Sequence, residues 1–143
     1  MMDGLGYRTV AAALLLGCSL SAFAQVAVIV NPKSPLTALT SEQAAAVFLG
    51  KSASLPGAGL AQPADLPDAS AVRELFYTKA AGKTAAQVKA AWARLTFSGK
   101  ASPPKELSSA ADVKKHVAGN VDAIGYIEKS AVDNTVKVVL VID

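Results

Sequence analysis

The residues best suited to chemistry lie together at the start of an expected helix, within the segment "LPDASAVRELF" (66–76). A proline turn precedes Asp68, and apolar residues recur at helical spacing after it. The first turn of a helix leaves backbone N–H groups unpaired and carries a partial positive charge of about half a unit. Such a helix start can bind a small anion. The candidate ligand-binding residues are Asp68, Ala69, Ser70, Ala71, Val72 and Arg73.

Two interpretations of this helix start remain open, and they differ in the role of Asp68. In the first, Asp68 caps the helix, takes the free N–H groups itself and repels a fully ionised anion. In the second, a singly protonated oxyanion donates a hydrogen bond to Asp68. Ser70, inside the first turn, and Arg73, about one turn on, would then contribute to binding, and Asp68 would select for protonated oxyanions.

Two other helix starts offer hydroxyl groups, but their sequences indicate ordinary capping. Thr40 is followed three residues later by Gln43, and Thr84 is followed by Gln87. This is the pattern of a capping box, in which the two side chains and the backbone satisfy each other. We therefore expect neither of these helix starts to bind an anion.

The residues of the common catalytic and metal sites are missing from the sequence. One histidine (His116) and one cysteine (Cys18) cannot build an ordinary transition-metal site. No serine lies in a G-x-S-x-G elbow, and neither a P-loop nor a G-x-G-x-x-G motif is present. We therefore expect a protein that is not an enzyme and uses no metal or cofactor. The aromatic residues expected to pack in or against the core are Phe76, Tyr77, Trp92 and Phe97.

The first 24 residues have the features of a secretory signal peptide. Arg8 supplies a positive charge, and "VAAALLLGCSL" (10–20) is an apolar run too short to span a bilayer comfortably. The small residues Ala22 and Ala24 suit cleavage after Ala24. The alternative is a lipoprotein signal, in which "LLGC" places a lipid anchor on Cys18. We expect a periplasmic protein, with no membrane insertion after cleavage at Ala24.

Residues 25–143 are expected to form one domain. The whole chain is 52% hydrophobic and 17% charged, with a net charge of +3, and loss of Arg8 and Asp3 with the leader leaves that charge unchanged. Basic residues are scattered without clustered aromatics, so we expect no nucleic-acid partner. A chain cleaved after Ala24 has no cysteine, and its fold must depend on the core alone.

Apolar periodicity predicts the order strand, helix, loop, three helices and two strands. The strands are expected at 26–31, 122–128 and 136–142. The helices are expected at 39–51, 69–81 and 84–97, with a fourth, short helix capped by Ser109. The segment 52–68 is expected to be mostly loop, with a short strand around 60–62. Strands separated by helices predict an α/β fold with a mixed β-sheet flanked by helices.

Four stretches of the sequence together resemble periplasmic phosphate-binding proteins of ABC transporters. In chain order they are "VIVNPKSPLTALTSEQAAAVFLGK", "SAVRELFYTKAAGK", "WARLTFSGKASPP" and "AIGYIE", and they span nearly all of 25–143. Members of that family have two α/β lobes hinged around a cleft that grips the ligand. The resemblance implies a single lobe of this periplasmic-binding-protein type, because residues 25–143 are too few for two.

The resemblance also implies where a ligand would bind. The family seats phosphate on a helix start of the form Asp-Gly-Ser-Gly-Thr, with an arginine shortly before it. Asp68 and Ser70 match this pattern, whereas alanines replace both glycines, Val72 replaces the threonine and Leu66 stands in place of the arginine. Alanine hinders the close backbone approach that glycine permits, so the expected binding of phosphate or a similar oxyanion is weak.

We therefore expect an exported, non-catalytic, solute-binding-like protein, linked to phosphate ABC transport, that binds a small oxyanion weakly. A second lobe-bearing protein or a second copy of the chain would supply the other wall of the site. The alternative is a periplasmic protein-interaction or scaffold module that has lost ligand binding.

Overall fold

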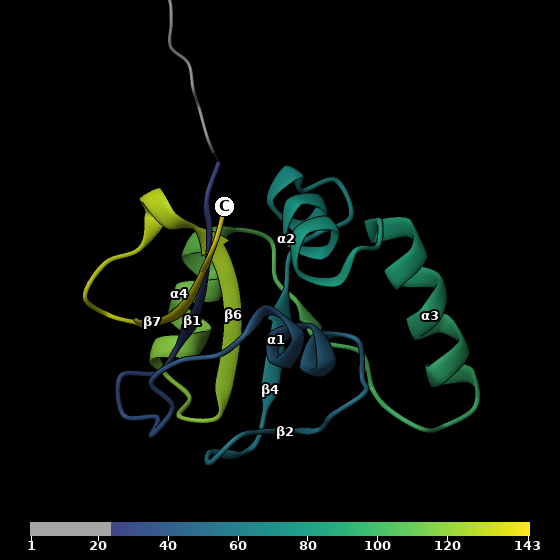
Figure 1. Cartoon of the computed structure of the whole chain (residues 1–143), viewed down its shortest axis with the longest axis horizontal. Coiled ribbons are helices and arrows are strands. Elements are labelled where there is room, and N and C mark those ends of the chain that lie inside the picture. The colour runs from purple at the N-terminus through teal and green to yellow at the C-terminus, as the bar shows by residue number, and fades with distance from the viewer. Residues whose placement is uncertain (1–23) are drawn as a thin grey trace, which may run out of the picture.

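The computed structural model describes residues 24–143, in which a five-stranded sheet forms the centre of the fold (Figure 1). Its strand order is β5-β4-β6-β1-β7. Strand β1 is antiparallel to β6 and β7, and β4 is parallel to β5 and β6. The strands are β1 (Val26–Val30), β4 (Gln62–Asp65), β5 (Lys105–Glu106), β6 (Ala123–Glu128) and β7 (Lys137–Ile142). The expected α/β fold with a mixed sheet is therefore confirmed. The expected leader lies outside the described residues apart from Ala24.

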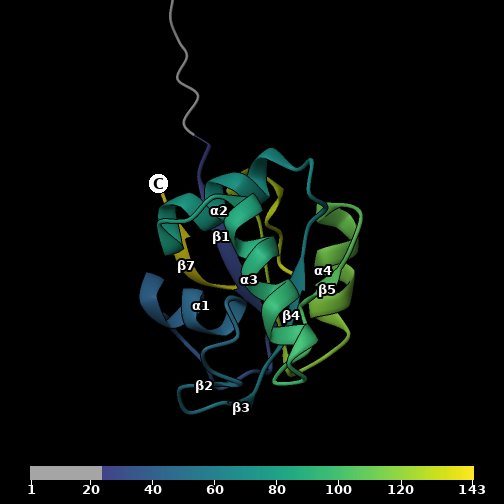
Figure 2. The same ribbon diagram turned by 90° about the vertical axis from the view of Figure 1, so that its right-hand side faces the viewer.

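Helices cover both faces of the sheet. Tyr126 of β6 stacks on Phe76 with ring centroids 4.2 Å apart, whereas a Cβ added to the neighbouring Gly125 would lie 2.6 Å from Val113. Because successive strand residues point to opposite faces, α1 and α2 cover one face and α4 covers the other. Helix α3 packs beside α2 at the periphery (Figures 1 and 2). The helices are α1 (Ser41–Phe48), α2 (Ala71–Ala81), α3 (Ala85–Phe97), α4 (Ala110–Ala118) and the 3-10 turn η1 (Lys129–Ala131).

The helix ends follow the predicted capping residues. Thr40 and Thr84 are the N-caps of α1 and α3, and each completes a capping box with the glutamine three residues later. Ser109 caps α4 by accepting a hydrogen bond from the backbone N–H of Asp112. Gly82 ends α2 in the left-handed conformation at φ 67°, which glycine adopts without a steric penalty. Local sequence therefore sets where most helices begin and end.

The core lies on both sides of the central strand β1 and extends to the helices of both faces. All five residues of β1 are buried, as expected for a strand covered on both faces. Phe48 of α1 packs edge-to-face against Phe76 of α2 at 4.9 Å and against Tyr126 at 5.5 Å. This aromatic contact holds α1 and α2 against the sheet, which in turn fixes the position of the first turn of α2.

The segment 52–68 contains more regular structure than its sequence predicts. Strands β2 (Ser54–Leu55) and β3 (Gly59–Leu60) form a hairpin, and β4 follows as an interior strand of the main sheet. The expected short strand around 60–62 therefore lies partly in β3 and partly in β4. Strand β4 has only four residues, one of them Pro63, so its sequence shows no alternation of apolar and polar residues. Its position in the sheet is determined by its pairing with β5 and β6.

One expected core residue is on the surface. Phe97, the last residue of α3, is 96% exposed, so its expected packing role is wrong. Phe76 and Tyr77 are fully buried, and Trp92 is buried with its indole N–H donated to the Phe48 carbonyl at 2.8 Å. The helix continues to Phe97, past the point at which its inner face meets the rest of the molecule.

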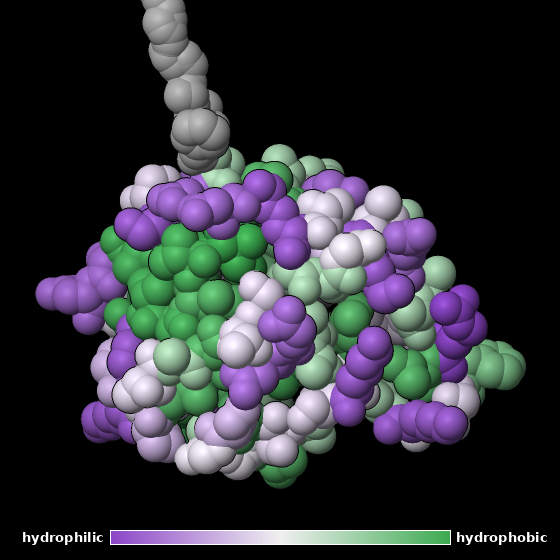
Figure 3. Space-filling view, in the orientation of Figure 1, coloured by the Kyte–Doolittle hydropathy of each residue, from purple (hydrophilic) through white to green (hydrophobic). Residues whose placement is uncertain are grey.

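Apolar surface gathers over the β7 end of the sheet (Figure 3). Val138 and Leu140 of β7 are half-buried, and Val141 is 38% exposed. Among residues 24–143, no helix is both long enough and apolar enough to cross a membrane.

Candidate functional site

The start of α2 differs from its predicted form, because Ser70 is the N-cap and the helix begins at Ala71 rather than near Ala69. The Ser70 Oγ accepts a hydrogen bond from the Arg73 N–H at 3.2 Å, and the Ser70 N–H is donated to the Pro67 carbonyl at 2.9 Å. Ser70 is therefore not inside the first turn. Asp68 does not cap the helix either, because the serine two residues later fills that position.

Backbone donors remain available at what we term the α2 tip, residues 69–72. Ala69 and Ala71 are exposed, and Ser70 and Val72 are half-buried. Within residues 24–143, the N–H groups of Ala71 and Val72 meet no hydrogen-bond acceptor. The Ser70 hydroxyl also retains its proton for donation, since its oxygen acts as the acceptor in the cap. The tip thus presents donors at the surface, as an anion site requires.

Asp68 is held at the edge of the tip by two cations. Its carboxylate accepts a hydrogen bond from the Lys89 ammonium of α3 and lies 3.8 Å from the Arg73 guanidinium. The hydrogen bond from Lys89 is the main reason that the pKa of Asp68 lies below its usual value. Asp68 is therefore ionised near neutral pH and can accept a hydrogen bond from a protonated ligand.

Arg73 belongs to a buried polar cluster beneath the tip. Its Nη1 donates to the Leu66 carbonyl at 2.8 Å and lies 3.4 Å from the Asp65 carboxylate. Asp65 also accepts hydrogen bonds from the hydroxyls of Tyr77, at 2.7 Å, and Tyr126. Burial, reinforced by the Asp65 charge, raises the pKa of both tyrosines. The charge of Arg73 is thus balanced inside the protein.

This cluster fixes the turn that leads from β4 into α2. Asp65 is the last residue of β4, and its carboxylate also accepts the Leu66 N–H at 3.0 Å. Asp65 and Tyr126 were not predicted as site residues from the sequence; they belong to different strands and lie 61 residues apart along the chain. The position of Asp65 between the apolar Ala64 and Leu66 was the available signal, because an acid in such surroundings needs a partner.

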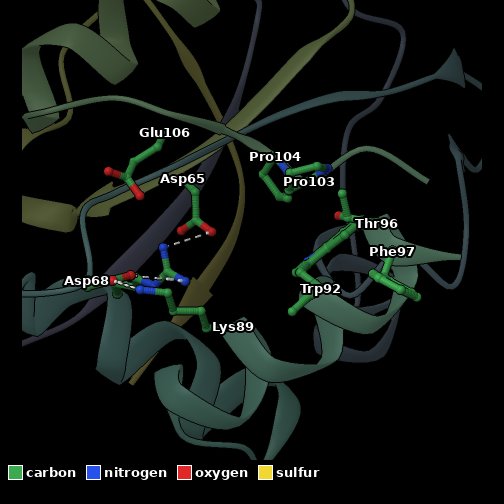
Figure 4. A pocket seen from close by; sticks show the side chains of 11 residues that line it. Asp65, Asp68, Lys89, Trp92, Thr96, Phe97, Pro103, Pro104 and Glu106 are labelled. Atoms are coloured by element: carbon green, nitrogen blue, oxygen red, sulfur yellow. Dashed lines mark hydrogen bonds and ion pairs between the residues drawn. The ribbon is translucent and has the colours of Figure 1, made fainter. Parts of the chain in front are cut away.

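A cavity of about 540 Å³ lies between the start of α2, helix α3 and the segment 103–106. We call it the α3 cavity. Asp68 and Arg73 of the predicted set line it, whereas Ala69, Ser70, Ala71 and Val72 do not. Figure 4 shows the charged side chains on one side and the aromatic and proline side chains on the other. The lining residues are Asp65, Asp68, Arg73, Lys89, Trp92, Ala93, Thr96, Phe97, Pro103, Pro104 and Glu106.

No group of three or more histidine, cysteine, aspartate or glutamate side chains within residues 24–143 is arranged to hold a metal ion. Asp65 and Asp68, the acids nearest the tip, are paired with cations. The donors of the tip and the ion pairs beside it suit recognition of a solute by hydrogen bonds.

The sheet topology and the flanking helices define the class of fold, a single lobe of the periplasmic-binding-protein type. Solved structures of phosphate receptors share it. A candidate phosphate ABC transporter substrate-binding protein from Clostridium perfringens, solved with bound phosphate, matches with a TM-score of 0.66 at 24% identity. An ABC-type phosphate transport receptor from Vibrio cholerae matches with a TM-score of 0.63 at 21% identity, and PstS from Borrelia burgdorferi matches with 0.59 at 16%.

These matches cover most of this chain but less than half of each neighbour. They span 81% of this chain and 45% of the Clostridium protein, 81% and 46% for the Vibrio protein, and 83% and 48% for the Borrelia protein. No protein-family model matches the sequence, and no curated protein matches it. The expected resemblance to one lobe of a phosphate-binding protein is therefore confirmed at the level of the fold.

Proposed function

We propose that this chain is an exported, non-catalytic, solute-binding-like protein whose α2 tip binds a small oxyanion weakly, in connection with phosphate ABC transport. The observation that carries the proposal is the pair of N–H groups at Ala71 and Val72, next to the Ser70 hydroxyl, which meet no acceptor within residues 24–143. The phosphate receptors that share the fold support it. Export to the periplasm rests on the signal peptide predicted for residues 1–24.

Weak binding follows from the number of donors that one lobe can offer. Each hydrogen bond to a charged group contributes about 1.5–3 kcal/mol, so two donors at the lower end of this range give about 3 kcal/mol, which is an affinity in the millimolar range. Alanines at 69 and 71 also keep the ligand farther from the backbone than glycines would. A second lobe-bearing protein or a second copy of the chain would add the missing donors and exclude water.

Asp68 gives the site a preference for protonated oxyanions. Phosphate carries at least one proton near neutral pH and can donate it to the Asp68 carboxylate, whereas sulfate has no proton to donate and is repelled. Replacing Asp68 by asparagine should remove this discrimination, because the amide can donate a hydrogen bond to either anion.

A thermal-shift titration tests the proposal. Phosphate should raise the melting temperature in proportion to its binding, by the linkage relation, and sulfate at matched ionic strength should raise it less. The variant Ser70→Asp keeps an N-cap side chain but places a negative charge at the tip, so it should abolish the phosphate shift. Ser102→Asp, which places the same charge on an exposed serine elsewhere, is the matched control and should leave the phosphate shift unchanged. A flat response of the native chain to every anion contradicts the proposal.

A second candidate function, a protein-interaction or scaffold module, is favoured by two observations. The α3 cavity beside the tip is lined by three carboxylates and two cations, a balance that disfavours anions. Apolar surface also remains open over β7 (Figure 3), and such surface marks contact sites when it is extensive. Sedimentation at increasing protein concentration tests this candidate: self-association that Leu140→Lys abolishes supports it, because Leu140 shares the face of Val28 and Tyr126, and a monomer at all concentrations argues against a second copy as the partner.

A further inference from the structure

The α3 cavity has two chemically different walls. Lys89, Asp68 and Glu106 supply charge on one side, and the opposite side carries Trp92, Phe97 and a pair of prolines (Figure 4). A volume of about 540 Å³ falls within the range of roughly 300–1,000 Å³ that small-molecule sites occupy. An inorganic oxyanion would fill little of this space and would contact none of the apolar wall. The cavity therefore suits an organic molecule with one charged end.

The charges that line the cavity leave one carboxylate in excess. Asp65 is paired with Arg73, and Asp68 is paired with Lys89. Glu106 is exposed and forms no ion pair or hydrogen bond with another side chain within residues 24–143. It lies beside Asp65, its register partner across β4 and β5, at the carboxyl ends of these two parallel strands. With three carboxylates and two cations, the lining of the cavity thus has a net negative charge.

The apolar wall complements a flat or aliphatic group. The Phe97 ring is 96% exposed, so covering it with a ligand would remove apolar surface from water. Pro103 and Pro104 lack backbone N–H groups and add a rigid apolar surface beside it. The aromatic faces also attract a nearby cation. The Glu106 carboxylate attracts a cation too, so both walls of the cavity favour a positively charged ligand.

We propose that the α3 cavity binds an organic ammonium, with its cationic end at Glu106 and its apolar body against Phe97 and the neighbouring prolines. The proposed contacts differ from those of the α2 tip, whose residues 69–72 do not line the cavity, although Asp68 borders both sites. The proposal therefore does not depend on oxyanion binding, and either can fail without the other. The balance of charge favours a monocation, because Lys89 and Arg73 are near enough to oppose a second positive group.

Three probes with a similar phenylalkyl body test the charge preference. These are 2-phenylethylammonium, the neutral 2-phenylethanol and the anionic 3-phenylpropanoate, and calorimetry measures their affinities for the full chain. The ammonium should bind at least three-fold more tightly than the alcohol, and the carboxylate should bind least tightly. Equal affinities, a preference for the carboxylate, or no detectable binding of the ammonium at tens of millimolar would overturn the proposal.

The single tryptophan locates the binding event. Trp92 lines the cavity and is the only tryptophan in the sequence, so its fluorescence should change on addition of the ammonium, with the same midpoint as the calorimetric titration. Calorimetric binding with unchanged fluorescence would place the probe elsewhere and overturn the assignment.

Two variants separate the charged wall from the apolar wall. Glu106→Gln should lower the affinity for the ammonium at least three-fold and leave the affinity for the alcohol unchanged. Phe97→Ala should weaken both probes by a similar factor. Both side chains are exposed, so the variants should fold. Glu42→Gln, on an exposed position of α1, is the matched control and should change neither affinity. Unchanged selectivity in Glu106→Gln contradicts the proposed placement of the ammonium.

Discussion

The guanidinium of Arg73 lies 3.4 Å from the carboxylate of Asp65, and both side chains are buried. Asp65 ends strand β4 and Arg73 belongs to the first turn of α2, so the pair fastens the helix start to the sheet. Arg73 therefore has a structural role, although it also lines the α3 cavity. The positive potential at the α2 tip therefore comes from backbone N–H groups and from the helix dipole.

Removing the charge of Asp65 should destabilise the fold. In Asp65→Asn, the buried Arg73 loses its counter-charge, and one of the two tyrosine hydroxyls loses its acceptor. Breaking a buried pair from one side costs about 3–5 kcal/mol, and we expect a loss near 3 kcal/mol in urea denaturation. The exposed Asp122→Asn is the control and should change stability by less than about 0.5 kcal/mol. A loss below about 1 kcal/mol for Asp65→Asn would show that the pair is not structural.

Gly125 should tolerate no side chain. A Cβ at this position would lie 2.6 Å from Val113 Cγ1 on α4, so Gly125→Ala must displace the helix or the strand. Overpacking of this kind costs about 1–3 kcal/mol. Shortening the opposing side chain in Gly125→Ala/Val113→Ala should recover part of the loss, so that the two changes are not additive. Additive losses would mean that α4 does not pack closely on Gly125.

Gly50 and Gly57 form a matched pair that separates backbone strain from a clash. Both have positive φ, 77° and 73°, so alanine at either position costs about 1–2 kcal/mol in strain. Only Gly50 faces another side chain, with Trp92 Cη2 lying 2.8 Å from the added Cβ. We expect Gly50→Ala to be more destabilising than Gly57→Ala and to alter Trp92 fluorescence. Equal losses with unchanged fluorescence would contradict this packing.

Stability should fall as the pH is lowered through the titration of His116. Desolvation, and to a lesser extent the charge of Lys105, lowers the pKa of His116 below its usual value of 6.5. Its Nε2 is buried and meets no hydrogen-bond partner within residues 24–143. The unfolded chain therefore binds a proton at a higher pH than the folded chain. The unfolding free energy should decrease below about pH 6.5 and level off once the pH is below the folded pKa.

The variant His116→Gln isolates this contribution. Its unfolding free energy, measured in urea from pH 8 to pH 5, should lack the decrease that the native chain shows over this range. Asp68, Asp112 and Asp133 titrate at lower pH, because hydrogen bonds lower their pKa values, that of Asp133 to about 2. An identical pH profile in both proteins would show that His116 does not contribute.

The sequence predicted the features that depend on local residue patterns. The buried run at β1 and the capping boxes at Thr40 and Thr84 are such features, because each is determined by residues within one or two turns of each other. The first turn of α2 was harder to predict. Asp68 and Ser70 are both good N-caps and lie two residues apart, and the choice of Ser70 depends on the Pro67 turn and on the pairing of Asp68 with Lys89.

Features that depend on contacts distant in sequence could not be predicted. Strand β4 has four residues, one of them proline, and exists because β5 and β6 pair with it on either side. The cluster around Asp65 likewise requires Tyr126, whose position follows from the register of β6 in the sheet. The α3 cavity combines residues of α2, α3 and the segment 103–106, and no local pattern indicates that these approach one another.

The most direct test of the proposed oxyanion site is a phosphate titration of the ¹⁵N-labelled chain, followed by amide NMR at constant ionic strength with chloride as the balancing anion. We predict that the largest shifts occur at the amides of Ala71 and Val72, that they saturate in the millimolar range, and that Ser70→Asp removes them. Unmoved amides at 69–72, or shifts of equal size at the capped starts of α1 and α3, would contradict binding at the α2 tip.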